Sequence, residues 1–209
     1  SINWAAAHAD AILEAWYPGS HGGTAIAEAL LGEYNPGGKL TVTFPKTVGQ
    51  IPFNFPAKPN SQVDGPRRPG LDGNQSRING ALYDFGFGLS YTTFAYSNLE
   101  LSDREIRPDE SFEVAFDIAN TGSRRGDEVV QLYVRDLLSG VTRPVRELKG
   151  FRKVMLRAGE SREVTFTLSP DDLSFWRLDK KWGQEPGDYH VWAGHDSDCT
   201  LGGSFRITE

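Results

Sequence analysis

The residues best suited to bind a ligand lie in a short glycine-rich turn, Pro18-Gly19-Ser20-His21-Gly22-Gly23. An apolar run precedes this turn and a helical pattern follows it, which is how open α/β sheets build ligand sites. Backbone N–H groups at the helix start can donate hydrogen bonds to hydroxyl groups or orient a carboxylate. His21 adds a side chain that can hydrogen-bond a ligand, and Gly22 and Gly23 are expected to take positive φ and allow close backbone approach. The alternative is a tight turn with an exposed histidine.

Five other side chains carry groups of interest, and each has a structural alternative. Trp16 and Tyr17 directly precede the turn, and their rings either stack on a ligand or pack in a core. The Glu14 carboxylate either faces a crevice or joins an ion pair. Arg67 and Arg68 lie in a long loop, where they either reach a substrate or a neighbouring subunit or are solvated.

Metal and thiol chemistry is not expected in this chain. Cysteine occurs once, so an intramolecular disulfide and a C-x-x-C site are excluded. The histidines are scattered without the spacing of metal ligands; they are His8, His21, His190 and His195. We therefore predict neither a metal nor another cofactor.

Composition and charge argue against two classes of partner. The chain has 209 residues, of which 38% are hydrophobic and 24% charged, as in ordinary globular proteins. The net charge of −6 disfavours nucleic acid, whose phosphates require a basic face. No apolar run approaches the ~18 residues of a membrane span, so a membrane is not expected as a partner. Residues 1–10 lack the basic region of a signal peptide, and the compartment is left open.

The elements that position the turn follow from hydrophobic periodicity in residues 1–55. Residues 3–12 are alanine-rich and are expected to end a helix, and the apolar run 11–17 is expected to form a buried strand. A helix is predicted from Thr24, with one face formed by Ala25, Ile26, Ala29 and Leu30 and with Gly32 as its C-cap. Residues 40–44 alternate as a strand that Pro45 ends. Two strands and one or two helices make only part of an α/β domain, so the remainder must come from other polypeptide.

A connector and an all-β region complete the chain. Residues 56–93 form a proline- and glycine-rich loop and connector, in which 56–80 hold almost no large apolar side chains. Tyr83, Phe85 and Phe87 are expected to pack between domains. Residues 94–209 show short alternating runs separated by turn signals, typical of a sandwich of about seven strands. The inward residues are Phe112, Val114, Phe116, Ile118, Val130, Leu132, Val134, Val164, Phe166, Leu168, Tyr189, Val191, Ala193, Phe205 and Ile207.

These motifs together resemble one known family. The segment "WAAAHADAILEAWYPGSHGGTAIAEALLGEYNPGGKLTVTFPKTVGQIP" is similar to the late part of the α/β-sandwich domain of glycoside hydrolase family 3, and "LYDFGFGLSYTTFAYSNLELS" is similar to the bridge into its last domain. "NTGSRRGDEVVQLYVRD", "VTRPVRELKGFRKVMLRAGESREVTFTLSPDDLSFW" and "EPGDYHVWAG" resemble its fibronectin type III-like domain. The expected fold is therefore a partial, three-layer α/β domain followed by a fibronectin type III-like all-β sandwich.

The resemblance implies a retaining β-glycosidase, usually a β-glucosidase or β-xylosidase, acting on a β-glucoside or another β-linked oligosaccharide. Such enzymes use two carboxylates about 5–5.5 Å apart. In the family the nucleophile is an Asp of a TIM barrel and the acid/base is a Glu of the α/β-sandwich domain. Both would lie upstream of Ser1, so no catalytic residue is assigned to this chain, and the upstream polypeptide is its expected partner. The family often carries an acidic or amide side chain in the glycine turn, where this chain has Ser20-His21.

Two other functional classes stay open. One is a carbohydrate-binding module, and the other is a structural role in which the sandwich supports the α/β domain or forms a homodimer contact. A free-standing binding module would have no reason to carry part of an α/β domain, which favours the enzyme segment. The residues expected close to substrate are Ser20, His21, Gly22, Gly23, Trp16, Arg67 and Arg68.

Overall fold

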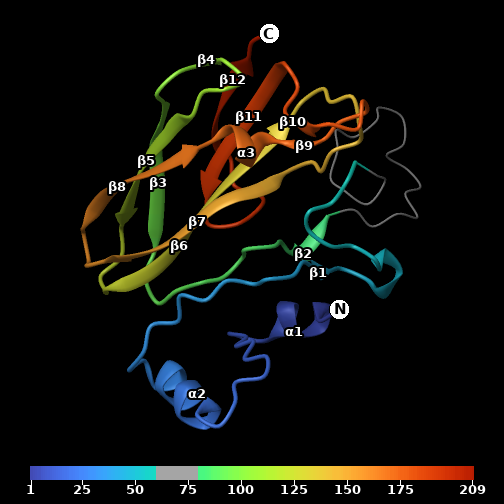
Figure 1. Cartoon of the computed structure of the whole chain (residues 1–209). Helices are drawn as coiled ribbons and strands as arrows, with labels where there is room; N and C mark the ends of the chain where they lie inside the picture. Colours follow the sequence, from blue (N-terminus) through green and yellow to red (C-terminus); the bar gives the residue numbers. More distant parts are fainter. Residues whose placement is uncertain (60–79) are drawn as a thin grey trace, which may run out of the picture.

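Two β-sheets pack face to face and form the larger part of the molecule (Figure 1). The computed structural model describes residues 1–59 and 80–209. One sheet has five strands in the order β4-β12-β11-β6-β7, and the other has three in the order β3-β5-β8. Neighbouring strands are antiparallel except β12 and β4, which run parallel. This arrangement is the predicted sandwich.

The bounds of the sandwich strands follow the alternating runs of the sequence. The five-stranded sheet contains β4 (Glu105–Ile106), β6 (Gly126–Asp136), β7 (Glu147–Leu156), β11 (Gly187–Gly194) and β12 (Leu201–Ile207). The three-stranded sheet contains β3 (Phe94–Leu101), β5 (Phe112–Asn120) and β8 (Ser161–Leu168). The short helix α3 (Pro170–Leu173) follows β8, and β9 (Phe175–Trp176) and β10 (Trp182–Gly183) form a separate two-stranded ribbon.

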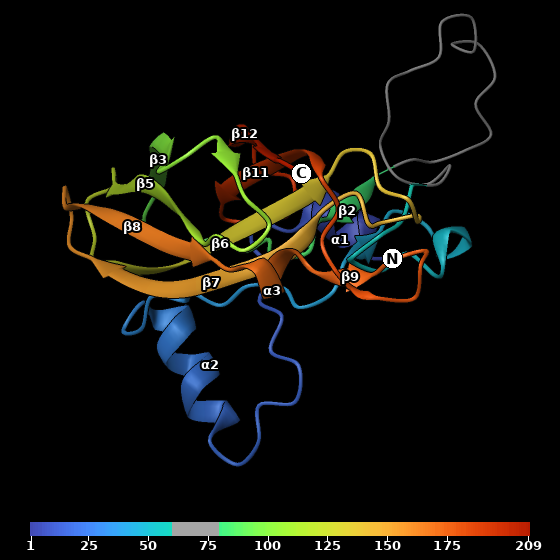
Figure 2. The ribbon, with the colours of Figure 1, turned by 45° about the horizontal axis from the view of Figure 1, so that its top comes forward.

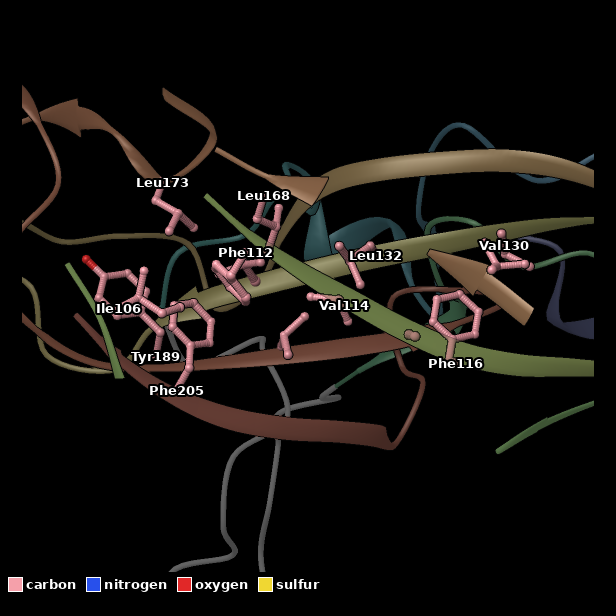
Figure 3. Packing of buried hydrophobic residues seen from close by; sticks show 14 of the residues in the cluster. Ile106, Phe112, Val114, Phe116, Val130, Leu132, Leu168, Leu173, Tyr189 and Phe205 are labelled. Atoms are coloured by element: carbon pink, nitrogen blue, oxygen red, sulfur yellow. The ribbon is translucent and has the colours of Figure 1, made fainter. Parts of the chain in front are cut away.

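The core lies between the two sheets. Every second residue of β5 is almost fully buried, from Phe112 at 3% exposed to Ile118 at 0%, as a strand with one inward face requires. Leu132 of β6 and Phe205 of β12 reach the same interior from the opposite sheet (Figure 3). These side chains belong to a single buried cluster, so the sandwich has a hydrophobic core of its own.

Before the sandwich, residues 1–59 and 80–93 contain little regular structure. They comprise α1 (Asn3–His8), α2 (Gly22–Leu31), the 3-10 turn η1 (Val48–Gln50) and the short pair β1 (Phe44–Pro45) and β2 (Ala81–Tyr83). Helix α2 projects below the sandwich and exposes most of its surface to solvent (Figure 2). None of the described helices is long and apolar enough to span a membrane.

Helix α2 confirms one sequence prediction and corrects another. Gly32 caps its C-terminus with φ of +77° and donates its N–H to the Ala29 carbonyl, as predicted. Ala29 is buried, but Leu30, assigned to the same face, is 68% exposed. The end of the helix is attached to the connector by one hydrogen bond, from the Tyr91 hydroxyl to the Ala29 carbonyl at 2.6 Å.

Both strands predicted in residues 1–55 require correction. Residues 11–17 form no strand, and Ile12 and Leu13 are 45% and 43% exposed. An extended segment needs a neighbouring strand for its N–H and C=O groups, and no described strand pairs with 11–17. The predicted strand 40–44 is reduced to β1. Leu40 exchanges two hydrogen bonds of 2.8 Å with the connector, but residues 40–43 form no strand.

Candidate functional site

The glycine turn forms the entry to helix α2. Gly19, with φ of +72°, is the glycine of this turn that takes a left-handed conformation, so the expectation of positive φ at Gly22 and Gly23 is wrong. Gly22 is the first helical residue, and its N–H donates to the Gly19 carbonyl at 3.1 Å. Gly22 packs tightly against Pro18, because an added Cβ would lie 2.5 Å from Cγ of Pro18.

His21 occupies the N-cap of α2 but does not cap it. Its backbone lies at φ −94° and ψ 7°, and its side chain makes no cap hydrogen bond. Ser20 and His21 are both exposed. Since the first N–H groups of a helix lack an acceptor one turn earlier, this helix start is a donor surface with an imidazole at its edge. The turn therefore offers hydrogen bonds to an incoming group, but the strand expected before it is missing from the described structure.

Trp16 and Tyr17 are surface residues, so the expectation that they pack in a core is not met. Tyr17 is completely exposed, and Trp16 is 51% exposed with φ of +46°. The Trp16 ring makes an edge contact with Phe44 at 6.3 Å between centroids, and the Glu14 carboxylate accepts the Trp16 backbone N–H at 3.0 Å. Glu14 thus holds its own segment locally. Arg67 and Arg68 lie outside the described residues.

The structure brings together a polar cluster that was not predicted from the sequence, where Lys39, the connector and β6 meet. Lys39 pairs with Glu128 at 2.8 Å, with 9% and 5% of the two side chains exposed. Lys39 also donates to the Gly88 carbonyl at 2.7 Å. Burial raises the pKa of Glu128, and the nearby Lys39 ammonium only partly offsets this effect.

A second ionisable pair lies in the turn between β11 and β12. His195 Nε2 is 3.1 Å from Asp196 Oδ2, and this hydrogen bond raises the pKa of His195. Burial opposes ionisation of Asp196, but the hydrogen bonds from His195 and the Asp198 backbone outweigh it and lower the pKa of Asp196. Within the pair, His195 therefore stays protonated to higher pH, and Asp196 stays ionised to lower pH, than each would alone.

A cleft of about 550 Å³ opens beside this pair. The connector contributes Tyr83, Asp84 and Phe87, and the sandwich contributes Tyr96, His195 and Asp196. Tyr83 and Phe87 stack on each other at 5.0 Å, and Phe55 stacks on Phe85 at 4.3 Å and contacts Tyr133 of β6 edge-on at 5.6 Å, so these aromatics pack where the connector meets the sandwich. Among residues 1–59 and 80–209, no group of three or more His, Cys, Asp or Glu side chains is arranged to hold a metal.

One signal for this cluster is present in the sequence of β6. Residues 130–134 are all buried, whichever face of the strand they lie on, and all except Gln131 are apolar or aromatic. A strand of this kind is covered on both faces, whereas an exposed face was expected here. If β6 had been recognised as covered on both faces, burial of Gln131 and Tyr133 could have been predicted.

Comparisons with known proteins match both regions of the chain. Residues 1–91 match the glycosyl hydrolase family 3 C-terminal domain, and residues 128–197 match the fibronectin type III-like domain. Over 201 residues the chain is 41% identical to a periplasmic β-glucosidase of Salmonella typhimurium, covering 95% of this chain and 26% of that protein. A β-xylosidase of Formosa agariphila is 40% identical over 199 residues, covering 94% of this chain and 27% of that protein.

The solved structures agree with the sequence matches. The crystal structure of a β-glucosidase from Listeria innocua in complex with glucose is similar with a TM-score of 0.88 and 35% identity. That match covers 98% of this chain and 29% of the other. The chain thus spans a little over a quarter of the length of these relatives.

Proposed function

Because the chain belongs to glycosyl hydrolase family 3, we propose that it is the C-terminal segment of a retaining β-glycosidase. The enzyme removes terminal β-linked sugars from the non-reducing end, with a β-glucoside as the most favoured substrate. The nucleophilic Asp and the acid/base Glu belong to upstream polypeptide, so this segment completes the fold around a catalytic pair that it does not contain. Relatives named β-glucosidase and β-xylosidase, each about four times as long, support this proposal.

The observation that best supports this proposal is that the two regions of the structure differ in how far they bury their apolar side chains. The sandwich buries its apolar residues, whereas the first 34 residues expose Trp4 at 75%, Tyr17 at 101% and Leu31 at 76%. Exposed apolar surface of this kind marks an interaction site. The proposed partner is the upstream part of the same α/β domain. In that assembly Ser20, His21, Gly22, Gly23 and Trp16 lie near the substrate and donate hydrogen bonds or support the acid/base Glu.

Nitrophenol release from aryl β-glucosides and β-xylosides tests the proposal. The purified 209-residue chain is expected to show no turnover above buffer. Co-expression with the polypeptide encoded upstream of Ser1 is expected to produce activity, and the upstream polypeptide alone is expected to produce little. Turnover by the isolated chain, or full activity of the upstream polypeptide without it, would contradict the proposal.

A carbohydrate-binding role is the second candidate, and it is favoured by the β9–β10 ribbon. Trp176 and Trp182 lie opposite each other there, are 66% and 55% exposed, and contact each other at 5.7 Å. Exposed tryptophan rings can stack on sugars. Retention of the 209-residue chain on insoluble cellulose or xylan, lost in Trp176→Ala, would support this role. Equal elution of both forms in the void volume would exclude it.

A further inference from the structure

Two segments run side by side as they meet β6, one from the chain after helix α2 and one from the connector. We call residues 37–40 the first arm and residues 84–88 the second arm. They are joined by hydrogen bonds from Leu40 N to Phe87 O and from Gly86 N to Leu40 O, both 2.8 Å. The arms continue into the pair β1 and β2, which we call the stalk. Whatever holds the arms therefore sets the direction in which the stalk leaves the sandwich.

Gln131 is the residue of β6 on which the second arm rests. Its side-chain amide nitrogen donates to the Gly86 carbonyl at 3.2 Å and to the His195 carbonyl at 2.5 Å. Its Oε1 accepts the Tyr133 hydroxyl. Gln131 is 3% exposed, so its side chain joins the connector, the β11–β12 turn and its own strand within a buried space.

The contact is close enough to require glycine on the other side. Gly86 has φ of +84°, a conformation that favours glycine. An added Cβ would lie 2.2 Å from Oε1 of Gln131, which no real contact allows. The second arm is thus seated directly against the amide of Gln131, with no room for a side chain between them.

Three further contacts fasten the arms and their surroundings at the same place. Lys39 of the first arm pairs with Glu128. Phe55 makes an edge contact with the Tyr133 ring at 5.6 Å between centroids. The Ser197 N–H donates to the Phe85 carbonyl at 2.9 Å. These contacts come from β6 and from the β11–β12 turn beside it, so both parts of the sandwich hold the arms.

We propose that Gln131 is a positioning residue that fixes the stalk on the sandwich, and that the sandwich serves as a rigid mount for the connector. The inference rests on the proposed function in one respect: the mounted segments then meet the upstream domains in a single orientation. The fixing itself is a property of this chain. It can therefore be tested without any activity, and its failure is distinguishable from failure of the glycosidase proposal.

Amide hydrogen exchange on the 209-residue chain provides the first test. Gln131→Leu keeps the approximate volume but removes both donors and the acceptor. We expect exchange at Leu40, Gly86 and Ser197 to accelerate at least about tenfold, while the β5–β8 amides around Phe116 keep their rates. Gln184→Leu is the matched control, because Gln184 is also buried and donates to a backbone carbonyl, that of Pro108, away from the arms.

Two outcomes of this experiment are decisive. Unchanged exchange at all three amides in Gln131→Leu would overturn the proposal. The same would follow if Gln184→Leu loosened the arms equally. If Gln131→Leu loses protection throughout the sandwich, Gly86→Ala provides a second test, because it disrupts the same contact from the connector. Gly86→Ala is expected to accelerate exchange in the arms while β5 and β8 stay protected. Uniform loss in that variant too would reduce the contact to general stability and overturn the proposal.

Gln131→Glu separates positioning from packing. The ionised carboxylate would face the carbonyl oxygens of Gly86 and His195, whereas the protonated acid retains one donor. Protection factors at Leu40 and Gly86, corrected for intrinsic exchange, are expected to fall at neutral pH and to recover towards those of the unsubstituted chain at acidic pH. A pH-independent loss of protection would contradict a role for the donated hydrogen bonds.

In the complete enzyme, Gln131→Leu can also be tested by its kinetics. Gln131→Leu is expected to raise KM for aryl β-glucosides more than it lowers kcat, because substrate contacts are displaced while the carboxylate pair is intact. If exchange accelerates but KM and kcat do not change, Gln131 still fixes the stalk on the sandwich. The stalk then makes no contribution to substrate binding.

Discussion

Lys39 and Glu128 form a buried ion pair that joins the segment after helix α2 to the sandwich, with 2.8 Å between Nζ and Oε1 and less than a tenth of either side chain exposed. Removing one partner of a buried pair leaves an uncompensated charge, which costs about 3–5 kcal/mol, whereas replacing both by apolar groups is often nearly neutral. We therefore expect Glu128→Leu to destabilise the chain strongly and Lys39→Met/Glu128→Leu to recover most of the loss.

Urea unfolding of the two single variants and the double variant measures this coupling. The double-mutant cycle isolates the pair from the separate bond that Lys39 makes to the Gly88 carbonyl. Lys153 and Asp127 form an ion pair with 55% and 23% of their side chains exposed, and Lys153→Met serves as the control that should cost under about 1 kcal/mol. Additive effects of Lys39→Met and Glu128→Leu would show that the buried pair is not coupled.

Stability is expected to fall as pH rises above 4.5 because of Glu128, and further as pH rises above 6.5 because of His195. Burial raises the pKa of Glu128 above 4.5, and the Asp196 hydrogen bond raises that of His195 above 6.5. Both groups hold their protons more tightly in the folded chain. The free energy of unfolding therefore decreases as pH rises through each folded-state pKa. Asp196, whose pKa is lowered despite burial, acts oppositely and loses its stabilising effect only as pH falls below 3.8.

Variants assign this pH dependence to its groups. Denaturant unfolding between about pH 5 and pH 8 should show a smaller decline in His195→Gln and in Glu128→Gln than in the unsubstituted chain. His190 provides a control of opposite sign, because burial and the Arg146 charge lower its pKa. His190→Gln should steepen the decline. Identical slopes in all four proteins would refute the assignment.

The sandwich was predictable from the sequence because its strands bury one face each. In β5, Phe112, Val114 and Phe116 alternate with smaller or polar residues, and this period determines both the strand and its inward side. The run 11–17 carried a different signal, a short continuous apolar stretch, and the strand that it predicted does not form. A strand depends on a partner strand as well as on its own composition, and among the described residues none pairs with it.

The contact at Gln131 was less accessible for a different reason. Gln131 and Gly86 are 45 residues apart, and the sequence around each residue does not predict its contact with the other. The turn at Gly19 shows the same limit on a smaller scale: the glycine content predicted positive φ at Gly22 and Gly23, but the left-handed residue is Gly19. Periodicity reports burial, whereas pairings between distant polar groups require the fold.

Gly22 and Gly23 are expected to respond oppositely to alanine. A Cβ at Gly22 would lie 2.5 Å from Cγ of Pro18, whereas one at Gly23 meets nothing within 4 Å. Gly22→Ala should therefore distort the turn and destabilise α2 by about 1–3 kcal/mol. Gly23→Ala should stabilise the helix by up to about 1 kcal/mol, because alanine loses less backbone entropy. Carbon chemical shifts of Ala25 to Leu31 report the helix population, and equal shifts in both variants would contradict this reading.

His21 is expected to act on substrate without supporting the fold. It is exposed and makes no cap hydrogen bond, so His21→Ala should leave the thermal midpoint of the complete enzyme within about 1 °C. Loss of one hydrogen bond to a charged group, or to a group that becomes charged during the reaction, costs about 1.5–3 kcal/mol, which lowers kcat/KM roughly 10- to 150-fold. His190→Ala is the control, because His190 lies on β11 and contacts Ser204 of the sandwich. If His21→Ala keeps kcat/KM within about twofold of the unsubstituted enzyme on several aryl β-glycosides, the turn has only a structural role.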